Sequence, residues 1–172
     1  SYKNIKTKAK TVSLIKNDVL IDLGSIAKGY ITDKLGTFIH KKGLKEFMID
    51  SRGDILFSGN LNHVLGVQHP RKKDDIFCSI KLNNECVATS GDYNQFYGSY
   101  EVSHILNRDD DVISTTVICK NLEDADLFAS MLFVSNKTDR RKIMSNHRKI
   151  KALVIKKSLI PEFYNNFEKI IT

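Results

Sequence analysis

Four short segments of this 172-residue chain carry residue types that could bind a phosphorylated ligand and act on it. In the first, an apolar run enters a helix-like pattern through Gly24 and Ser25, and Lys28 follows. The N-terminus of a helix offers unpaired backbone amides and the positive end of the helix dipole, which suit phosphate. With the charge of Lys28 beside it, this segment predicts a phosphate site. Taken alone, it also fits an ordinary turn between a strand and a helix.

The second segment places two hydroxyls and a glycine after a short apolar strand pattern. Thr89 and Ser90 can hydrogen-bond to the oxygen atoms of a ligand, and Gly91 lets a ligand approach the backbone closely. We therefore predict that these residues line a binding pocket, with a tight polar turn as the alternative.

The remaining two segments suggest proton transfer and metal binding. His104 stands between a polar and an apolar residue; a histidine exchanges protons near neutral pH, and a purely structural role is the alternative. Asp126 and Ser130 lie four residues apart in a helical pattern, so they share one helix face. A carboxylate and a hydroxyl are hard oxygen ligands that suit Mg²⁺. An acid near a helix start could instead only complement the helix dipole.

The elements that must hold these segments can be predicted from the periodicity of apolar residues. The first helix is expected to begin near Ile26 and to stop at Gly43, because Ile31, Leu35 and Phe38 recur at helical spacing. Strands are expected over residues 12–14, 19–23, 46–50, 55–57, 64–68, 76–82, 86–89, 115–119 and 152–155.

Three more helices are expected in the second half of the chain. Asn121 is a candidate N-cap for a helix with acids in its first turn that continues to Phe133. A charged helix is expected over residues 139–147, and Pro161 is expected to open a final amphipathic helix through Ile171. Without a strict strand–helix–strand repeat, this pattern predicts a single α+β domain over residues 1–172, with a mixed or antiparallel sheet and packed helices.

Composition and charge narrow the function further. The 27 Lys and Arg against 20 Asp and Glu give a net charge of +7, which attracts anions in general. No exposed aromatic residues are interleaved with the basic ones in a recognised motif, so a nucleic-acid partner is not expected. No apolar run is long enough to cross a bilayer.

The three cysteines, Cys78, Cys86 and Cys119, fit neither a disulfide framework nor a zinc motif. We expect them to be reduced core residues. Together with the lack of a signal segment at the start, they point toward the cytoplasm. An exported or membrane-associated protein whose signal is missing from this sequence is the alternative.

Taken together and in this order, the four segments resemble the signatures of the ApbE family of FAD:protein FMN transferases. The family signatures DLGGIAKGYxxD, TSGDY, HIxDP and ADALAT resemble DLGSIAKGYITD at 22–33, ATSGDY at 88–93, SHIL at 103–106 and ADLFAS at 125–130. Weaker similarities lie at residues 53–55, where the family has a GGD turn, and at 66–70, where it has a strand that ends in proline. The similarity covers residues 15–134 and, more faintly, the rest of the chain.

The resemblance implies an ApbE-like fold related to the T-fold and a Mg²⁺-dependent reaction. Family members bind FAD and transfer FMN from it to a threonine of a target flavoprotein, releasing AMP. By similarity, the metal ligands would be Asp126, Ser130 and the backbone carbonyl of Ala27, and His104 would be the base that activates the threonine. The residues expected at the FAD site are Gly24, Lys28, Tyr30, Asp33, Thr89, Ser90, Gly91, His104 and Ile105.

Several departures from the family pattern keep other functions open. Ser25 and Arg52 stand where the family usually has glycines. Asn107 and Arg108 replace the Asp-Pro after the histidine segment, and three acids at 109–111 stand where a Thr-Gly turn usually follows. Family members also carry a substantial region before the first signature, so this chain is expected to be naturally short or a fragment.

Two alternatives therefore stand beside the transferase. One is an FAD pyrophosphatase that releases FMN and AMP without transfer to a protein, and the other is a non-catalytic flavin-binding remnant. The sequence predicts neither the target protein nor the oligomeric state.

Overall fold

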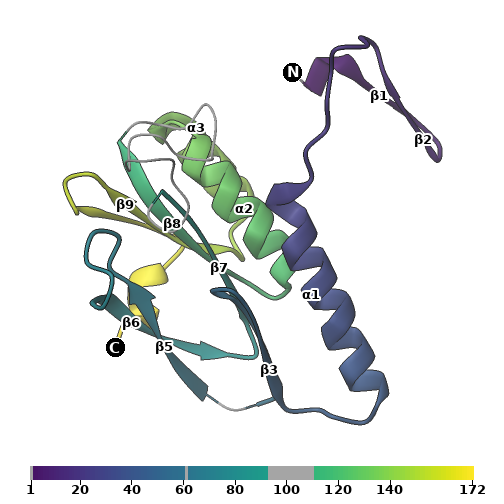
Figure 1. Cartoon of the computed structure of the whole chain (residues 1–172). Helices are drawn as coiled ribbons and strands as arrows, with labels where there is room; N and C mark the ends of the chain where they lie inside the picture. Colours follow the sequence, from purple (N-terminus) through teal and green to yellow (C-terminus); the bar gives the residue numbers. More distant parts are fainter. Residues whose placement is uncertain (1, 61, 93–110) are drawn as a thin grey trace.

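The centre of the molecule is a six-stranded antiparallel sheet (Figure 1). The computed structural model describes residues 2–60, 62–92 and 111–172. The strands follow the order β10, β9, β8, β7, β4 and β3 across the sheet. Their bounds are Pro161–Tyr164, Lys151–Lys156, Val112–Cys119, Cys86–Gly91, Asp54–Ser58 and Phe47–Ser51. The predicted α+β class and antiparallel sheet are confirmed.

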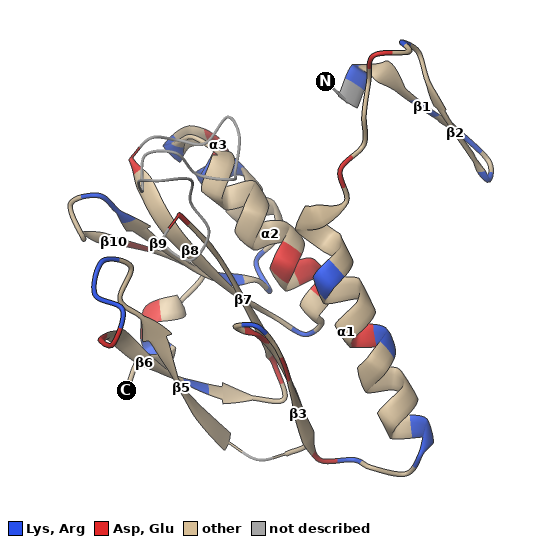
Figure 2. Cartoon of the chain, viewed as in Figure 1, with Lys and Arg blue, Asp and Glu red and all other residues tan. Residues whose placement is uncertain are grey.

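Helices cover one face of this sheet, with α1 and α2 side by side (Figure 1). The helices are α1 (Gly24–Lys41), α2 (Leu122–Val134) and α3 (Lys137–Asn146). The side chain of Asn121 accepts a hydrogen bond from the Asp124 amide at 2.7 Å, which confirms the predicted N-cap of α2. Acids in the first turn of α2 and basic residues in the last turn of α1 complement the helix dipoles (Figure 2).

A second, smaller sheet covers the opposite face together with the C-terminal 3₁₀ helix η2. These elements are β5 (Asn62–Gln68), β6 (Ile76–Asn83) and η2 (Phe167–Ile170). One apolar cluster therefore lies between the main sheet and the helices, and another lies between the main sheet and these elements. Strand β8 is buried at every position because both of its faces are covered.

The N-terminal part of the chain stands apart from these layers (Figure 1). After the 3₁₀ turn η1 (Tyr2–Asn4), β1 (Ile5–Lys8) and β2 (Thr11–Leu14) form a hairpin whose strand residues are all exposed. The register sets Ile5 opposite Leu14 and Thr7 opposite Val12, so these side chains share one face of the hairpin. We call residues 5–23 the arm.

Two predicted elements are wrong, the first because the segment has no strand beside it and the second because the segment pairs with β9 instead. Residues 19–23 form no strand; Leu20 is 94% exposed, and no described strand lies beside the segment to pair with it. Instead of a final helix, Pro161 begins β10, which pairs with β9. Asn165 and Asn166 then adopt positive φ angles of 54° and 63°, a conformation that interrupts a helix.

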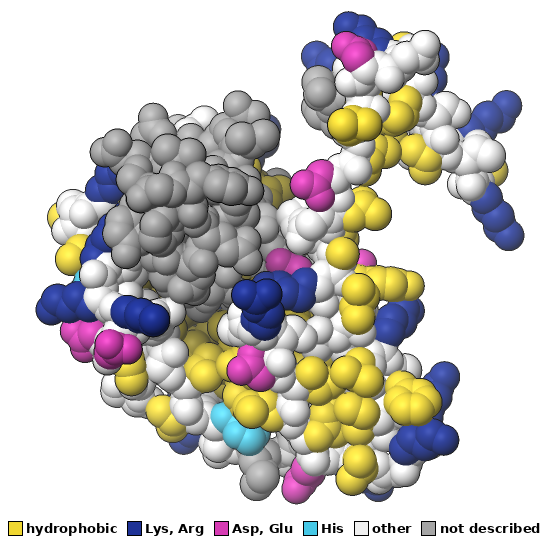
Figure 3. Space-filling view, viewed as in Figure 1, with side chains coloured by type: hydrophobic (Ala, Val, Ile, Leu, Met, Phe, Trp, Pro, Cys, Tyr) yellow, Lys and Arg dark blue, Asp and Glu magenta, His cyan; other side chains and the backbone are white. Residues whose placement is uncertain are grey.

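The first helix exists as predicted, but its apolar residues face outward. Ile31, Leu35 and Phe38 are 45–63% exposed, and yellow side chains gather along α1 in Figure 3. The buried positions of α1 are instead small residues such as Gly29 and Gly36. No described helix is both long and apolar enough to span a membrane.

Candidate functional site

A cleft of about 920 Å³ opens where α1, α2, β7, the β3–β4 turn and the small sheet meet. Seven of the residues predicted to bind ligand or metal line it: Gly24, Lys28, Thr89, Ser90, Gly91, Asp126 and Ser130. Apolar side chains from β5 and α2, including Leu65, Val67, Leu127 and Met131, line it as well. The cleft thus combines an apolar wall with a few converging polar groups, as small-molecule sites do.

The cleft begins where two neighbouring strands separate. Strands β4 and β7 pair only at Ile55 with Val87 and at Leu56 with Cys86. Beyond these rungs the side chain of Asp54 takes over, because its Oδ1 accepts a hydrogen bond from the Thr89 amide at 3.1 Å.

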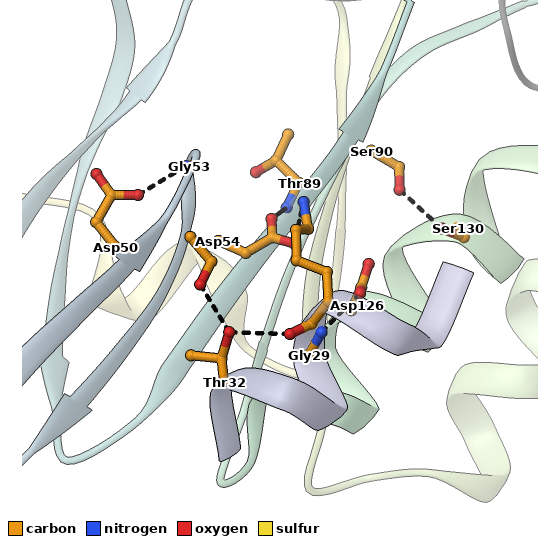
Figure 4. A network of polar contacts seen from close by, with 11 residues as sticks. Gly29, Thr32, Asp50, Gly53, Asp54, Thr89, Ser90, Asp126 and Ser130 are labelled. Atoms are coloured by element: carbon orange, nitrogen blue, oxygen red, sulfur yellow. Dashed lines mark hydrogen bonds and ion pairs between the residues drawn. The ribbon is translucent and has the colours of Figure 1, made fainter. Parts of the chain in front are cut away.

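The same carboxylate also reaches the first helix. Asp54 Oδ2 lies 2.5 Å from Lys28 Nζ, so one side chain connects β4, β7 and α1 (Figure 4). Asp54 is 2% exposed, and its burial raises the pKa of the carboxyl, while the hydrogen bond and charge of Lys28 oppose that rise. The Lys28 side chain is 42% exposed, so its ammonium is both held by Asp54 and open to the cleft.

The predicted magnesium ligands lie on the other wall. Asp126 is 6% exposed, and its Oδ2 accepts a hydrogen bond from the Gly29 amide at 3.0 Å. Burial raises the pKa of Asp126, and the Gly29 amide opposes the rise. One turn along α2, Ser130 Oγ lies 3.1 Å from Ser90 Oγ on β7. The carboxylate and the hydroxyl therefore share the cleft-facing side of α2, as their spacing predicted.

The two helices approach each other so closely because Gly29 has no side chain. A Cβ built at Gly29 would lie 2.4 Å from the carbonyl oxygen of Leu122 and 2.7 Å from the Cα of Glu123. The close contact is what lets the Gly29 amide reach Asp126. Gly29 therefore helps to hold the site together, although it was not among the predicted site residues.

The N-terminus of α1 faces the cleft, but one of its amides is already used. The Gly24 amide donates a hydrogen bond to Asp22 Oδ1 at 2.7 Å. Asp22, Ser25 and Lys28 all line the cleft. The helix start therefore offers a phosphate fewer free amides than the sequence suggested, and the positive charge of Lys28 becomes the stronger attraction.

Three predicted residues do not line the cleft. Asp33 accepts hydrogen bonds from the Leu122 and Glu123 amides at 3.0 and 2.9 Å, so its carboxylate caps the start of α2. Tyr30 is 46% exposed on the outer side of α1, and Ala27 precedes Lys28 in the first turns of that helix. The predicted His104 and Ile105 fall outside the described residues.

Two buried carboxylates that were not among the predicted site residues connect the elements around the cleft. Asp54 entered the sequence analysis only through the weaker family similarity at residues 53–55. Asp92 is 1% exposed and pairs with Arg71 through two contacts of 2.8 and 3.0 Å, which tie the end of β7 to the turn after β5. A single acid in a sequence gives no sign of a partner 21 or 35 residues away.

The departure at Arg52 has a structural account. Arg52 and Gly53 form the two-residue turn between β3 and β4, and both have positive φ angles, 57° and 94°. Glycine adopts this conformation without strain, which explains why a glycine suits both positions. Arginine keeps the turn and adds a charged side chain to the lining of the cleft.

The donor set suits a hard cation. Within the described ranges, no group of three or more His, Cys, Asp or Glu side chains is placed to hold a metal. Burial raises the pKa of the Cys86 and Cys119 thiols to about 12, so neither offers a thiolate. A carboxylate with a neighbouring hydroxyl on α2 fits Mg²⁺, which retains several waters and needs few protein ligands.

Comparison with known protein families and sequences gives a consistent result. A family model described as "ApbE family" matches residues 1–154. The FAD:protein FMN transferase of Buchnera aphidicola (subsp. Baizongia pistaciae) is 27% identical over 150 residues, which are 80% of this chain and 44% of that protein. The Vibrio cholerae protein of the same name is 26% identical over 90% of this chain and 50% of its own length. The chain thus spans about half the length of these relatives.

Two solved structures share the fold. The ApbE protein of Thermotoga maritima matches with a TM-score of 0.87 and 29% identity, covering 100% of this chain and 60% of its own. The flavin transferase ApbE of Vibrio cholerae matches with a TM-score of 0.80 and 22% identity, covering 99% of this chain and 59% of its own. The arm is included in both alignments, because nearly the whole chain is covered.

Proposed function

Since the chain belongs to the ApbE family, we propose that it transfers FMN from FAD to a threonine hydroxyl of a target flavoprotein and releases AMP, with Mg²⁺ as cofactor. The observation that carries this proposal is the single cleft between Lys28 on one side and the Asp126–Ser130 pair on the other. A diphosphate is strongly anionic, so a lysine ammonium and a site for a hard metal ion in the same cleft suit its binding.

The cleft has the size and lining that FAD needs. Its volume of about 920 Å³ lies in the range of small-molecule sites and suits a large dinucleotide. The apolar side chains that line the cleft, among them Leu65 on β5 and Met131 on α2, offer a surface for a flat ring system. An ammonium has three donors, so Lys28 can keep Asp54 and still bind phosphate oxygens.

The magnesium ligands in this proposal are the Asp126 carboxylate and the Ser130 hydroxyl, which line the cleft, together with the Ala27 carbonyl, which the family resemblance alone supplies. Asp126 uses one oxygen to accept the Gly29 amide, and a carboxylate has further lone pairs for a metal. When bound, Mg²⁺ would neutralise phosphate charge and help to orient the diphosphate. Gly29 and Asp33 fix the position of α2, and hence of its two ligands, against α1.

The chain's own residues would then position the FAD and take the proton of the threonine hydroxyl. The threonine oxygen forms a bond to the phosphorus of the FMN half, the bond from that phosphorus to the bridging oxygen breaks, and AMP leaves with that oxygen. The hydroxyl proton goes to a base, a role that the resemblance gives to His104. Lys28 would hold the diphosphate, and Thr89, Ser90 and Gly91 would hold the nucleotide against β7.

Mass spectrometry of the acceptor tests this proposal directly. A flavoprotein domain with a threonine acceptor is incubated with the chain, FAD and Mg²⁺, and the expected result is a mass gain of one FMN that is lost when the metal is chelated. Release of AMP without a mass gain would replace the transferase by the pyrophosphatase. Tight FAD binding with neither product would favour the non-catalytic flavin-binding protein.

A further inference from the structure

We propose that Asp54 is a positioning residue of this cleft, which holds the Lys28 ammonium and the Thr89 backbone where they meet the diphosphate of the bound dinucleotide. The inference rests on the proposed function, because it names a residue through which the FAD site acts. Strand β8 pairs with β7 at Thr89, and Asp54 adds a contact to the same residue from β4.

Asp54 connects β4 to β7 beyond the point where their backbone pairing ends. The backbone ladder between β4 and β7 ends at Ile55 and Val87, and beyond it β7 continues toward the cleft through Gly91 with β8 as its only backbone partner among the described strands. The Asp54 carboxylate accepts the Thr89 amide immediately beyond the last rung. It therefore replaces a backbone contact and fixes the strand where the strand becomes a wall of the cleft.

The two members of the ion pair differ in exposure, and this difference shows which of them can contact a ligand. Asp54 is 2% exposed and Lys28 is 42% exposed, so the carboxylate lies behind and the ammonium lies in front, toward the cleft. A lysine side chain has many rotamers and loses that freedom when it binds a ligand. Since Asp54 already holds Lys28, most of this loss occurs before the phosphate arrives, which favours binding.

The charge of Asp54 also acts against an anionic ligand, and the geometry decides which effect is larger. The other charged groups that face Asp54 are Asp126 on α2 and Asp50 on β3. Lys28 stands between the Asp54 carboxylate and the cleft at 2.5 Å from it, so a phosphate meets the ammonium first. We therefore expect a net loss of affinity when the carboxylate is removed.

A double-mutant cycle on ligand affinity tests this inference. The dissociation constant of FAD is measured by flavin fluorescence, with Mg²⁺ present, for the wild-type chain, Asp54→Asn, Lys28→Met and the double variant. Asp54→Asn is expected to weaken binding by about tenfold. In the Lys28→Met background the same change is expected to alter binding by less than about twofold, because the group through which it acts is gone.

Two controls separate positioning from simple loss of structure. Riboflavin lacks the diphosphate, so its affinity should be the same for Asp54→Asn and wild type, whereas a collapsed cleft would weaken riboflavin and FAD together. Asp50→Asn removes an exposed neighbouring carboxylate that accepts the Gly53 amide, and FAD affinity should be unchanged. Asp54→Ala also removes the acceptor of the Thr89 amide, so it should bind FAD more weakly than Asp54→Asn.

The outcomes distinguish this inference from the function on which it rests. If Asp54→Asn binds FAD as tightly as the wild type, or more tightly, Asp54 only masks Lys28 and the positioning role is wrong. An equal loss in both backgrounds would also overturn it, because Asp54 would then not act through Lys28. If the wild-type chain itself binds no FAD, the proposed function fails first and the positioning role fails with it.

Discussion

The arm and the cleft contain similar apolar residues and could hardly differ more in what surrounds them. In the arm, Val12 is 61% exposed and Leu20 is 94% exposed. At the cleft, polar and charged groups such as Asp54, Asp92 and Asp126 are at most 6% exposed, and each has a partner on a different element. In these two regions, hydrophobicity alone therefore does not decide burial, because a side chain is buried only where another element covers it.

This contrast shows where the stability of the chain comes from. An isolated two-stranded hairpin is marginally stable in water, and no other described strand pairs with the hairpin of the arm. The cleft, in contrast, is held by contacts between α1, α2, β4 and β7 that are far apart in the sequence. Mutations should therefore separate the two regions clearly, and the following experiments order the expected effects from the largest to the smallest.

The largest difference is expected between two leucine truncations. Leu132 on α2 is fully buried, so Leu132→Ala should lower the free energy of unfolding by about 2–5 kcal/mol. Leu20→Ala in the arm should change it by less than about 0.5 kcal/mol, because the side chain is already in water. Urea unfolding measures both. A loss above about 1 kcal/mol for Leu20→Ala would show that the arm is covered in solution, which would contradict the contrast between an exposed arm and a buried cleft.

Loss of the proposed metal ligand should affect activity without affecting the fold. Asp126→Asn is expected to lower the rate of FMN transfer by about 100-fold or more, because a bound metal contributes several kcal/mol to the stabilisation of the transition state. Isothermal titration with Mg²⁺ should show the matching loss of metal binding. Glu123→Gln, on the same helix but outside the cleft lining, is the control and should keep wild-type activity. Transfer that survives Asp126→Asn would remove Asp126 from the metal site.

Two buried helix glycines should respond differently to the same added methyl group. Gly29→Ala places a Cβ 2.4 Å from a backbone oxygen, so we expect a loss of about 1–3 kcal/mol in the free energy of unfolding. Gly36→Ala meets the flexible end of Leu56 at 3.2 Å and the Phe47 ring at an ordinary 3.8 Å, and alanine favours the helix. We therefore expect Gly36→Ala to be within about 1 kcal/mol of wild type by urea unfolding. Equal losses would mean that the α1–α2 contact is looser than described.

Two helix caps provide a smaller, matched pair. Asn121 caps α2, which carries Asp126, and Asn136 caps α3, whose residues do not line the cleft. Replacing either with alanine should lower the free energy of unfolding by about 1 kcal/mol. Only Asn121→Ala should also weaken Mg²⁺ binding, since only α2 holds the ligands. Equal effects on Mg²⁺ binding would show that α3 contributes to the site.

The smallest effect is a pH dependence that originates at the cleft. Burial raises the pKa of Asp54, so the folded protein binds that proton more tightly than the unfolded chain does. The contribution of Asp54 to stability is therefore largest at low pH and declines as the pH rises above its ordinary pKa of 3.8. The free energy of unfolding of the wild type, relative to Asp54→Asn, should fall over that range in urea titrations. A relative stability that rises with pH would contradict this assignment.

Much of the local structure could be predicted from the sequence because it depends on local chemistry. The N-cap at Asn121 and the helix stop at Gly43, with its φ of 93°, were both confirmed. The strand predicted at residues 115–119 lies within β8, which agrees with the preference of consecutive β-branched residues for extended backbone. The four-residue spacing of Asp126 and Ser130 predicted that they share one face of a helix, and both line the cleft.

The tertiary structure decided what these elements do for each other. The strand predicted at residues 19–23 is missing because a strand needs a neighbour, and the outward face of α1 was unpredictable because periodicity does not say which face is covered. The sequence by itself determined most of the helix and strand positions, the signature segments and their family. Only the folded chain could bring Gly29 to Asp126, 97 residues away, and place Asp54 behind Lys28, because such contacts depend on packing between distant elements and leave no trace in local spacing.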